Sequence, residues 1–185
     1  MTNIAFSFNE ENQQLAQKEL SKYPLDKKES AVMALLYLAQ NQSDGWLPRE
    51  SMDYVASYLG MAAIRVYEIA SFYSMYNLKP VGKNFIQLCG TTPCWLRGAA
   101  DIAKACEEEL GIKMKETTED KLFTLVEVEC LGACANAPMV QINDDYYEDL
   151  TPEIMKDMIR RLKNGEKIKP GSQIARSCSA PKENN

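Results

Sequence analysis

Two patterns of hydrophobic residues follow one another along this 185-residue chain. From residue 9 to residue 79, apolar residues recur every three or four positions, which predicts amphipathic helices. Polar turns and glycines interrupt the pattern, so we expect four short helices, at residues 10–20, from 26 or 30 to 40, 49–59 and 62–76. Asn9 is placed to cap the first helix and Gly60 to end the third. This half of the chain therefore predicts a small helical bundle.

The pattern changes at Lys79-Pro-Val-Gly82, beyond which short apolar runs are rich in Val, Ile and Leu. These runs predict strands at residues 84–88, 123–128 and 139–142, with a turn at 143–145 that leads into Tyr146 and Tyr147. Helices are expected at residues 95–110 and from Thr151 to 162. The order βαβββα predicts a compact sheet domain of thioredoxin-like type with helices packed on the sheet.

The chain is therefore expected to have an α+β fold in two domains and a tail. Residues 1–80 form the helical N-terminal domain, and residues 81–163 form the sheet domain. Residues 164–185 are rich in Lys, Pro, Gly and Ser, which predicts an extended or disordered tail.

Composition and charge exclude several classes of protein. The net charge is −5 and no basic stripe is present, so nucleic-acid binding is not expected. The longest apolar run, residues 31–39, is far shorter than the roughly 20 residues that span a bilayer. The N-terminus lacks the features of a secretory signal or an organelle presequence, so we expect a soluble, cytoplasmic chain without membrane insertion. The chain has no histidine, so any metal must be bound by sulfur or oxygen.

Four of the six cysteines form two close pairs, Cys89 with Cys94 and Cys130 with Cys134. On the predicted map, all four lie in loops beside strand ends. Neighbouring strands are about 4.8 Å apart, so both loops can converge at one edge of the sheet. Glycines in the loops let backbone N–H groups approach sulfur, and Thr91 and Thr92 add hydroxyl donors. The spacing therefore predicts a centre of four thiolates.

The other two cysteines are not expected at this centre. Cys106 shares a helical face with apolar residues, which predicts a small hydrophobic residue in the core. Cys178 lies in the polar tail and is expected to be an exposed thiol without a role.

Three interpretations of the four thiolates compete. Structural zinc sites favour tighter C-x₂-C turns than the C-x₄-C and C-x₃-C found here. Dithiol redox enzymes need C-x-x-C, which the chain lacks. A [2Fe–2S] cluster takes four thiolates and tolerates the wider spacing. We therefore favour one [2Fe–2S] cluster, which moves one electron and performs no bond chemistry.

Residues 89–98 and 127–151, together with the helical segment that ends near Tyr76, resemble the thioredoxin-like [2Fe–2S] subunit of NADH:quinone oxidoreductase, respiratory complex I. The resemblance extends into the tail at Lys169-Pro-Gly171 and Arg176. It implies that Cys89, Cys94, Cys130 and Cys134 bind one binuclear cluster. It also implies a flavoprotein partner that carries FMN, an NADH site and a [4Fe–4S] cluster, beside other peripheral-arm subunits. The cluster of this family is thought to lie beside the flavin, off the main electron route.

Related subunits of NAD-linked hydrogenases and formate dehydrogenases carry the same cysteine motif, so the parent complex stays open, with complex I favoured. A zinc-stabilised interaction module and a free-standing ferredoxin are further alternatives. No G-x-G-x-x-G follows a predicted strand, so no site for NADH or FMN is expected in this chain. No residue is expected to act as a catalytic acid, base or nucleophile. Enzyme activity is expected only in the assembled complex, which would place the chain at the cytoplasmic side of the inner (plasma) membrane.

A first prediction concerns charge beside the cluster. A [2Fe–2S] cluster with four thiolates carries a charge of −2 when oxidised and −3 when reduced, and Glu127 and Glu129 flank Cys130 in an acidic chain. Their negative charge disfavours reduction, so Glu129→Gln is expected to raise the midpoint potential. A redox titration measures this. An unchanged potential would mean that both glutamates merely face solvent.

Overall fold

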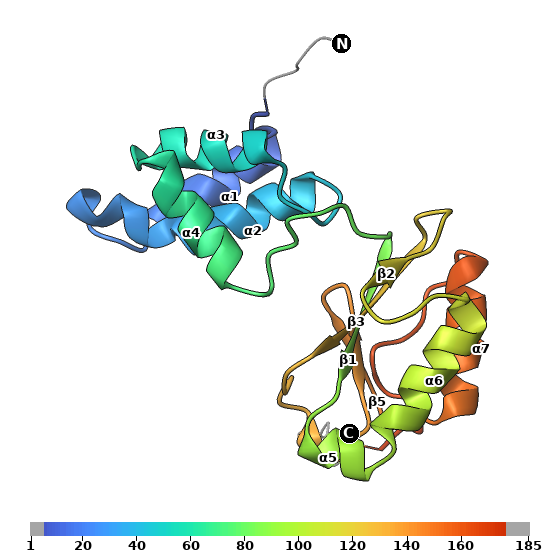
Figure 1. Cartoon of the computed structure of the whole chain (residues 1–185). Coiled ribbons are helices and arrows are strands. Elements are labelled where there is room, and N and C mark those ends of the chain that lie inside the picture. Colours follow the sequence, from blue (N-terminus) through green and yellow to red (C-terminus); the bar gives the residue numbers. More distant parts are fainter. Residues whose placement is uncertain (1–5, 177–185) are drawn as a thin grey trace. The chain divides into compact units, whose positions relative to one another are not determined.

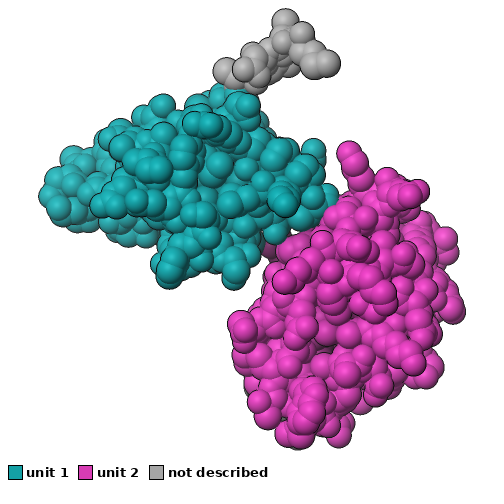
Figure 2. Space-filling model, viewed as in Figure 1, with its two compact units in different colours: residues 1–81 teal, residues 82–185 magenta. Residues whose placement is uncertain are grey.

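In the computed structural model, which describes residues 6–176, the chain divides into two compact units. They comprise Met1–Val81 and Gly82–Asn185, coloured separately in Figure 2. Each unit has its own core of buried hydrophobic residues. Among the described residues, no helix has both the length and the apolar character needed to cross a membrane.

In its described residues, 6–81, the first unit contains four α-helices and one 3₁₀ helix (Figure 1). Asn9 caps the first helix by accepting a 2.8 Å hydrogen bond from the N–H of Asn12. Gly60 ends the third with a left-handed φ of 68°, which glycine adopts without a steric penalty. The predicted boundaries of these two helices are confirmed. In order, the elements are α1 (Glu10–Leu20), η1 (Leu25–Ala31), α2 (Val32–Gln42), α3 (Arg49–Leu59) and α4 (Ala63–Phe72).

The fourth helix is shorter than predicted, because it ends at Phe72 and not at residue 76. Tyr73 takes an extended backbone conformation, which turns the chain back toward the unit's core. Tyr76 is therefore only 5% exposed, and its hydroxyl donates a 2.8 Å hydrogen bond to the carbonyl of Met33. Burial of this aromatic ring overrides the helical pattern of the sequence.

The second unit is built on a six-stranded sheet with strand order β2-β3-β1-β4-β5-β6. The central strand, β1, pairs in parallel with β3 and antiparallel with β4. In the parallel pair Cys89 lies opposite Val128, so the carboxyl ends of both strands lie at the same edge. The strands are β1 (Asn84–Cys89), β2 (Glu116–Thr117), β3 (Phe123–Val128), β4 (Val140–Ile142), β5 (Asp145–Glu148) and β6 (Gly171–Ser172).

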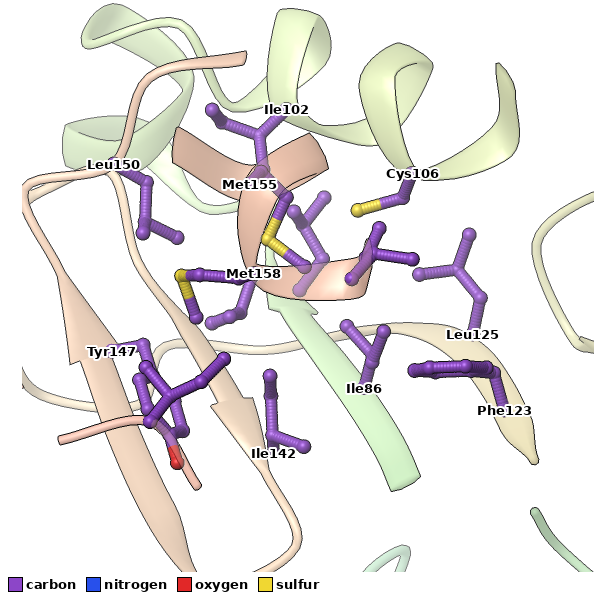
Figure 3. Close-up of a cluster of buried hydrophobic side chains, with 14 residues drawn as sticks. Ile86, Ile102, Cys106, Phe123, Leu125, Ile142, Tyr147, Leu150, Met155 and Met158 are labelled. Carbon is purple, nitrogen blue, oxygen red and sulfur yellow. The ribbon is translucent and has the colours of Figure 1, made fainter. Parts of the chain in front are cut away.

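Two long helices, α6 (Ala99–Leu110) and α7 (Pro152–Lys163), lie side by side on one face of this sheet (Figure 1). Figure 3 shows their apolar side chains directed at those of the strands, for example Ile102 and Met155 over Ile86. Cys106 is fully buried among them, and burial raises the pKa of its thiol to about 12. The prediction that Cys106 packs as a core residue is confirmed.

The predicted helix at residues 95–110 is two helices, and this boundary was wrong. Gly98 has a φ of 97° and separates α6 from a short helix, α5 (Thr92–Leu96). Cys94 therefore lies within a helix instead of preceding one. Strands β2 and β6 were not predicted, because two-residue strands are too short to show an alternating pattern.

Part of the expected tail is ordered against the sheet. Ile168 is only 7% exposed and belongs to the core of the second unit. Beyond it, β6 pairs in parallel with β5, with Gly171 opposite Tyr147. The chain up to residue 176 therefore belongs to the sheet unit, whereas Cys178 lies outside the described residues.

Gly82 generates a prediction about stability. A Cβ atom at this position would lie 2.5 Å from the backbone carbon of Phe123, an atom that cannot move without displacing β3. Gly82→Ala is expected to lower the free energy of unfolding by about 1–3 kcal/mol, the usual cost of overpacking. Denaturant unfolding measures this change. The adjacent exposed residue supplies the control, Lys83→Ala, and equal stability of the two variants would refute the steric explanation.

Candidate metal centre

The four predicted cysteines lie at the edge of the sheet where β1 and β3 end. Cys89 is the last residue of β1 and Cys94 lies in α5, and they are 2% and 1% exposed. Cys130 lies two residues beyond β3, and Cys134 begins a 3₁₀ turn, η2 (Cys134–Asn136). Both of these cysteines are exposed, and their sulfur atoms are 3.6 Å apart. The centre thus consists of a buried pair and an exposed pair.

The two loops that carry the pairs converge. Leu131 and Ala133, from the second loop, pack against the small buried cluster that contains Cys89 and Cys94. The Cys134 thiol is close enough to both buried cysteines to interact with them electrostatically. The parallel register of β1 and β3 therefore places all four sulfurs at one end of the sheet. The Ala137–Pro138 peptide, where the second loop ends, is cis.

Hydrogen-bond donors surround the sulfur of Cys89. Burial acts to raise the pKa of this thiol, but donors to its sulfur outweigh burial and hold the pKa below its usual value. These donors are the hydroxyl and the N–H of Thr91, with the hydroxyl 3.3 Å from the sulfur, and the N–H of Leu131. The sequence indicated the role of the Thr91 hydroxyl, whereas the Leu131 N–H depends on how the second loop folds. The environment of the Cys89 sulfur therefore stabilises the negatively charged thiolate.

The other thiols respond to burial and to each other. Burial, assisted by a hydrogen bond with Cys89, raises the pKa of Cys94 to about 12, although the N–H of Met139 donates to its sulfur. The hydrogen bond with Cys130 is the main cause that raises the pKa of the exposed Cys134. A metal must therefore displace protons from these thiols, as metal binding to cysteine generally does.

The arrangement fits a binuclear cluster. The thiols form two pairs, and a [2Fe–2S] cluster takes two thiolates on each of its irons. The N–H and hydroxyl donors at Cys89 and Cys94 are of the kind that stabilises thiolate sulfur in such clusters. That these four cysteines are the ligands stays a prediction.

Glutamate side chains lie close to this edge of the sheet. Glu127 and Glu129 are both exposed. A Cβ atom at Gly90, next to Cys89, would lie 2.1 Å from a carboxylate oxygen of Glu127. Because residue 90 has no side chain, the Glu127 carboxylate can lie against the backbone beside Cys89.

A small sheet domain with two thiol pairs at one sheet edge has the ligands that the class of iron–sulfur proteins requires. Comparison with protein families agrees, since residues 16–163 match the model of the thioredoxin-like [2Fe-2S] ferredoxins. The chain belongs to this family, and the prediction of one [2Fe–2S] cluster is confirmed. The predicted α+β fold is confirmed as well.

Named relatives are similar over most of the chain. A protein of Rickettsia bellii that is named as a subunit of NADH-quinone oxidoreductase is 60% identical over 159 residues, which cover 86% of this chain and 95% of the relative. The mitochondrial NADH dehydrogenase [ubiquinone] flavoprotein 2 of Dictyostelium discoideum is 49% identical over 94% of this chain and 70% of its own length.

A solved structure shares the fold. The crystal structure of an air-oxidised NAD+-reducing [NiFe]-hydrogenase superimposes with a TM-score of 0.62 at 18% identity, over 70% of this chain. The superposition covers 23% of the hydrogenase chain. This likeness shows the fold alone.

The hydroxyl of Thr91 generates a prediction. Its hydrogen bond to the sulfur of Cys89 favours the reduced, more negative cluster, so Thr91→Val is expected to lower the midpoint potential. The expected shift is about 50 mV, slightly less than the roughly 59 mV that corresponds to a tenfold change in a one-electron equilibrium. Redox titration measures it. Thr92→Val, at the exposed neighbouring residue, is the matched control, and equal potentials for both variants would exclude this role for Thr91.

Proposed function

We propose that this chain is the [2Fe–2S] electron-transfer subunit in the NADH-oxidising part of NADH:quinone oxidoreductase, respiratory complex I. One observation carries the proposal. The chain has two thiol pairs at a single sheet edge, within a sequence 60% identical to a protein named for that complex. We assign Cys89, Cys94, Cys130 and Cys134 as the ligands of the cluster. When bound, the cluster supplies a one-electron carrier.

The residues of this chain hold the cluster and regulate its contact with water. Cys89 and Cys94 are buried between β1, α5 and the start of β4, which keeps water from one side. Cys130 and Cys134 lie at the surface, so the other side is open to a partner. One buried pair and one exposed pair suit a protein that must retain its cofactor and still exchange electrons.

The proposed partner is a flavoprotein subunit with FMN, an NADH site and a [4Fe–4S] cluster, within the peripheral arm of the complex. The helical unit and the segment beyond residue 163 are proposed to dock on it. The Rickettsia relative is by its name one of several subunits, and this supports a partner of that kind. The chain would then lie in the cytoplasm, peripheral to the plasma membrane.

The hydrogenase alternative has weaker support. Its structure resembles this chain in fold at 18% identity, whereas the relatives named for NADH-quinone oxidoreductase reach 60%. Identity of that size favours the respiratory complex as the parent. The zinc alternative does not agree with membership of a [2Fe–2S] family.

The test is analysis of anaerobically purified protein. Two irons, two acid-labile sulfides and a rhombic EPR signal after dithionite reduction are expected. Co-expression with the flavoprotein should give a stable complex on gel filtration, in which NADH produces the same signal. One zinc and no sulfide would refute the proposal. A cluster without a stable flavoprotein complex would instead indicate a free-standing ferredoxin.

Cysteine variants test the ligand assignment. Substitution of any of the four cysteines by serine is expected to abolish the rhombic signal or to change its g values, because an oxygen ligand replaces sulfur. Cys106→Ala is the matched control, since this cysteine packs in the core and is expected to leave the signal unchanged. A ligand variant with the wild-type spectrum would remove that cysteine from the assignment.

A further inference from the structure

The two proposed ligand pairs are held in place by different means. Cys89 and Cys94 lie in regular elements and are 2% and 1% exposed, so packing determines their positions. Cys130 and Cys134 are exposed, in a segment that lies between β3 and β4. Leu131 and Ala133 of this loop pack against the buried pair, whereas the two thiols themselves are exposed, so their positions depend more on hydrogen bonds. The partners of these hydrogen bonds lie far along the chain.

The turn that begins at Cys134 is held by an arginine–aspartate pair. Arg176 Nη2 donates a 2.7 Å hydrogen bond to the carbonyl of Ala135 and a second bond to Oδ1 of Asp149. The backbone N–H of Asp149 donates a 2.8 Å bond to the carbonyl of Asn136. Two successive carbonyl groups directly after Cys134 therefore accept hydrogen bonds, that of Ala135 from the Arg176 guanidinium and that of Asn136 from the backbone of Asp149.

This ion pair is itself anchored to the sheet. The Asp149 side chain is 5% exposed, and its Oδ2 accepts a 2.6 Å hydrogen bond from the hydroxyl of Ser172 in β6. The Ser172 oxygen in turn accepts a 3.0 Å bond from the backbone N–H of Arg176. Because β6 pairs with β5, the segment that carries Arg176 has a determined position. We name Arg176, Asp149 and Ser172 the C-terminal clamp.

The other end of the loop has a simpler attachment. The hydroxyl of Tyr146, in β5, donates a 2.8 Å hydrogen bond to the carbonyl of Leu131, the residue after Cys130. The exposed loop is thus tied to the protein beside each of its two cysteines. The attachment beside Cys134 contains the charged groups, and charge-assisted hydrogen bonds are the stronger ones.

We propose that the C-terminal clamp is a positioning device for Cys134. Arg176 acts through the carbonyl of Ala135, and the Asp149 carboxylate acts by holding the Arg176 guanidinium in place. The proposal rests on the assignment of Cys134 as a ligand. The clamp restricts the turn to one position, so the thiolate stays directed at the cluster and the cluster is retained. Groups that hydrogen-bond a metal ligand directly change metal affinity about 10–100-fold when they are removed. The clamp bonds the residues that follow the ligand, so an effect at the lower end of this range is expected.

The test measures how fast purified wild-type protein and variants lose the visible absorbance of the cluster in the presence of an iron chelator. Arg176→Gln and Asp149→Asn are each expected to accelerate the loss about tenfold. The double variant should be no faster than either single variant, because both remove the same device. Ser172→Ala, which leaves both charges in place, should accelerate the loss less.

The two single variants separate positioning from simple electrostatics. Arg176→Gln removes a positive charge and Asp149→Asn removes a negative charge. An effect of charge alone would therefore change the rate in opposite directions in the two variants, and likewise the midpoint potential. Positioning predicts faster loss in both, with the same broadening of the EPR signal. Opposite effects on the rate would overturn the proposal.

Two controls exclude general destabilisation. Arg160→Gln breaks an arginine–carboxylate pair with Glu109 between α6 and α7, with bonds of 2.8 and 3.1 Å, and should leave the rate unchanged. Gly82→Ala destabilises the sheet at the opposite end of β1, and loss as fast as in the clamp variants would overturn the proposal. A wild-type chain without iron and sulfide would refute the proposed function, and the clamp with it. Wild-type retention in every clamp variant would refute the clamp alone.

Discussion

The parallel pairing of β1 with β3 is the constraint on which the rest of the sheet unit depends. Just before the first paired residue, Asn84, the backbone at Gly82 passes so close to Phe123 that a side chain has no room. The N–H of Gly82 also donates a 2.6 Å hydrogen bond to the Thr124 hydroxyl. The parallel pairing ends with Cys89 opposite Val128. Because parallel strands finish at the same edge, two segments about 40 residues apart in sequence begin side by side there. A shift by one residue would move each core side chain to the other face of the sheet and separate the thiol pairs.

The difference in burial between the two pairs has a physical consequence. Desolvation makes thiolates costly at Cys89 and Cys94. At Cys89, hydrogen-bond donors, including the Leu131 N–H, together outweigh that cost. At the exposed pair, water stabilises charge but packing provides less restraint, so hydrogen bonds from Tyr146 and Arg176 take over. The same centre thus combines a side shielded from water with a side open to a partner.

Opposing influences act on the electron affinity of the proposed cluster. The acidic chain and the exposed glutamates near Cys130 disfavour added negative charge. Hydrogen bonds to the sulfur of Cys89 favour it. Hydrogen bonds act at contact distance, whereas solvent screens charges on exposed side chains, so the donors to sulfur have the more direct effect.

The sequence by itself determined the class of fold and the kind of cluster, and it predicted the two units and the four cysteine ligands. Period and spacing are local properties, and the absence of histidine limits the ligands to sulfur and oxygen. Only the tertiary structure decided where α4 ends, that the helix breaks at Gly98, and that residues 164–176 are ordered. The end of α4 and the ordered segment depend on Tyr76 and Ile168, which are placed by burial in a core. The tertiary structure also decided which groups support the site. Asp149 and Arg176 are 27 residues apart, and no pattern in the sequence pairs a buried carboxylate with a distant arginine before the chain has folded.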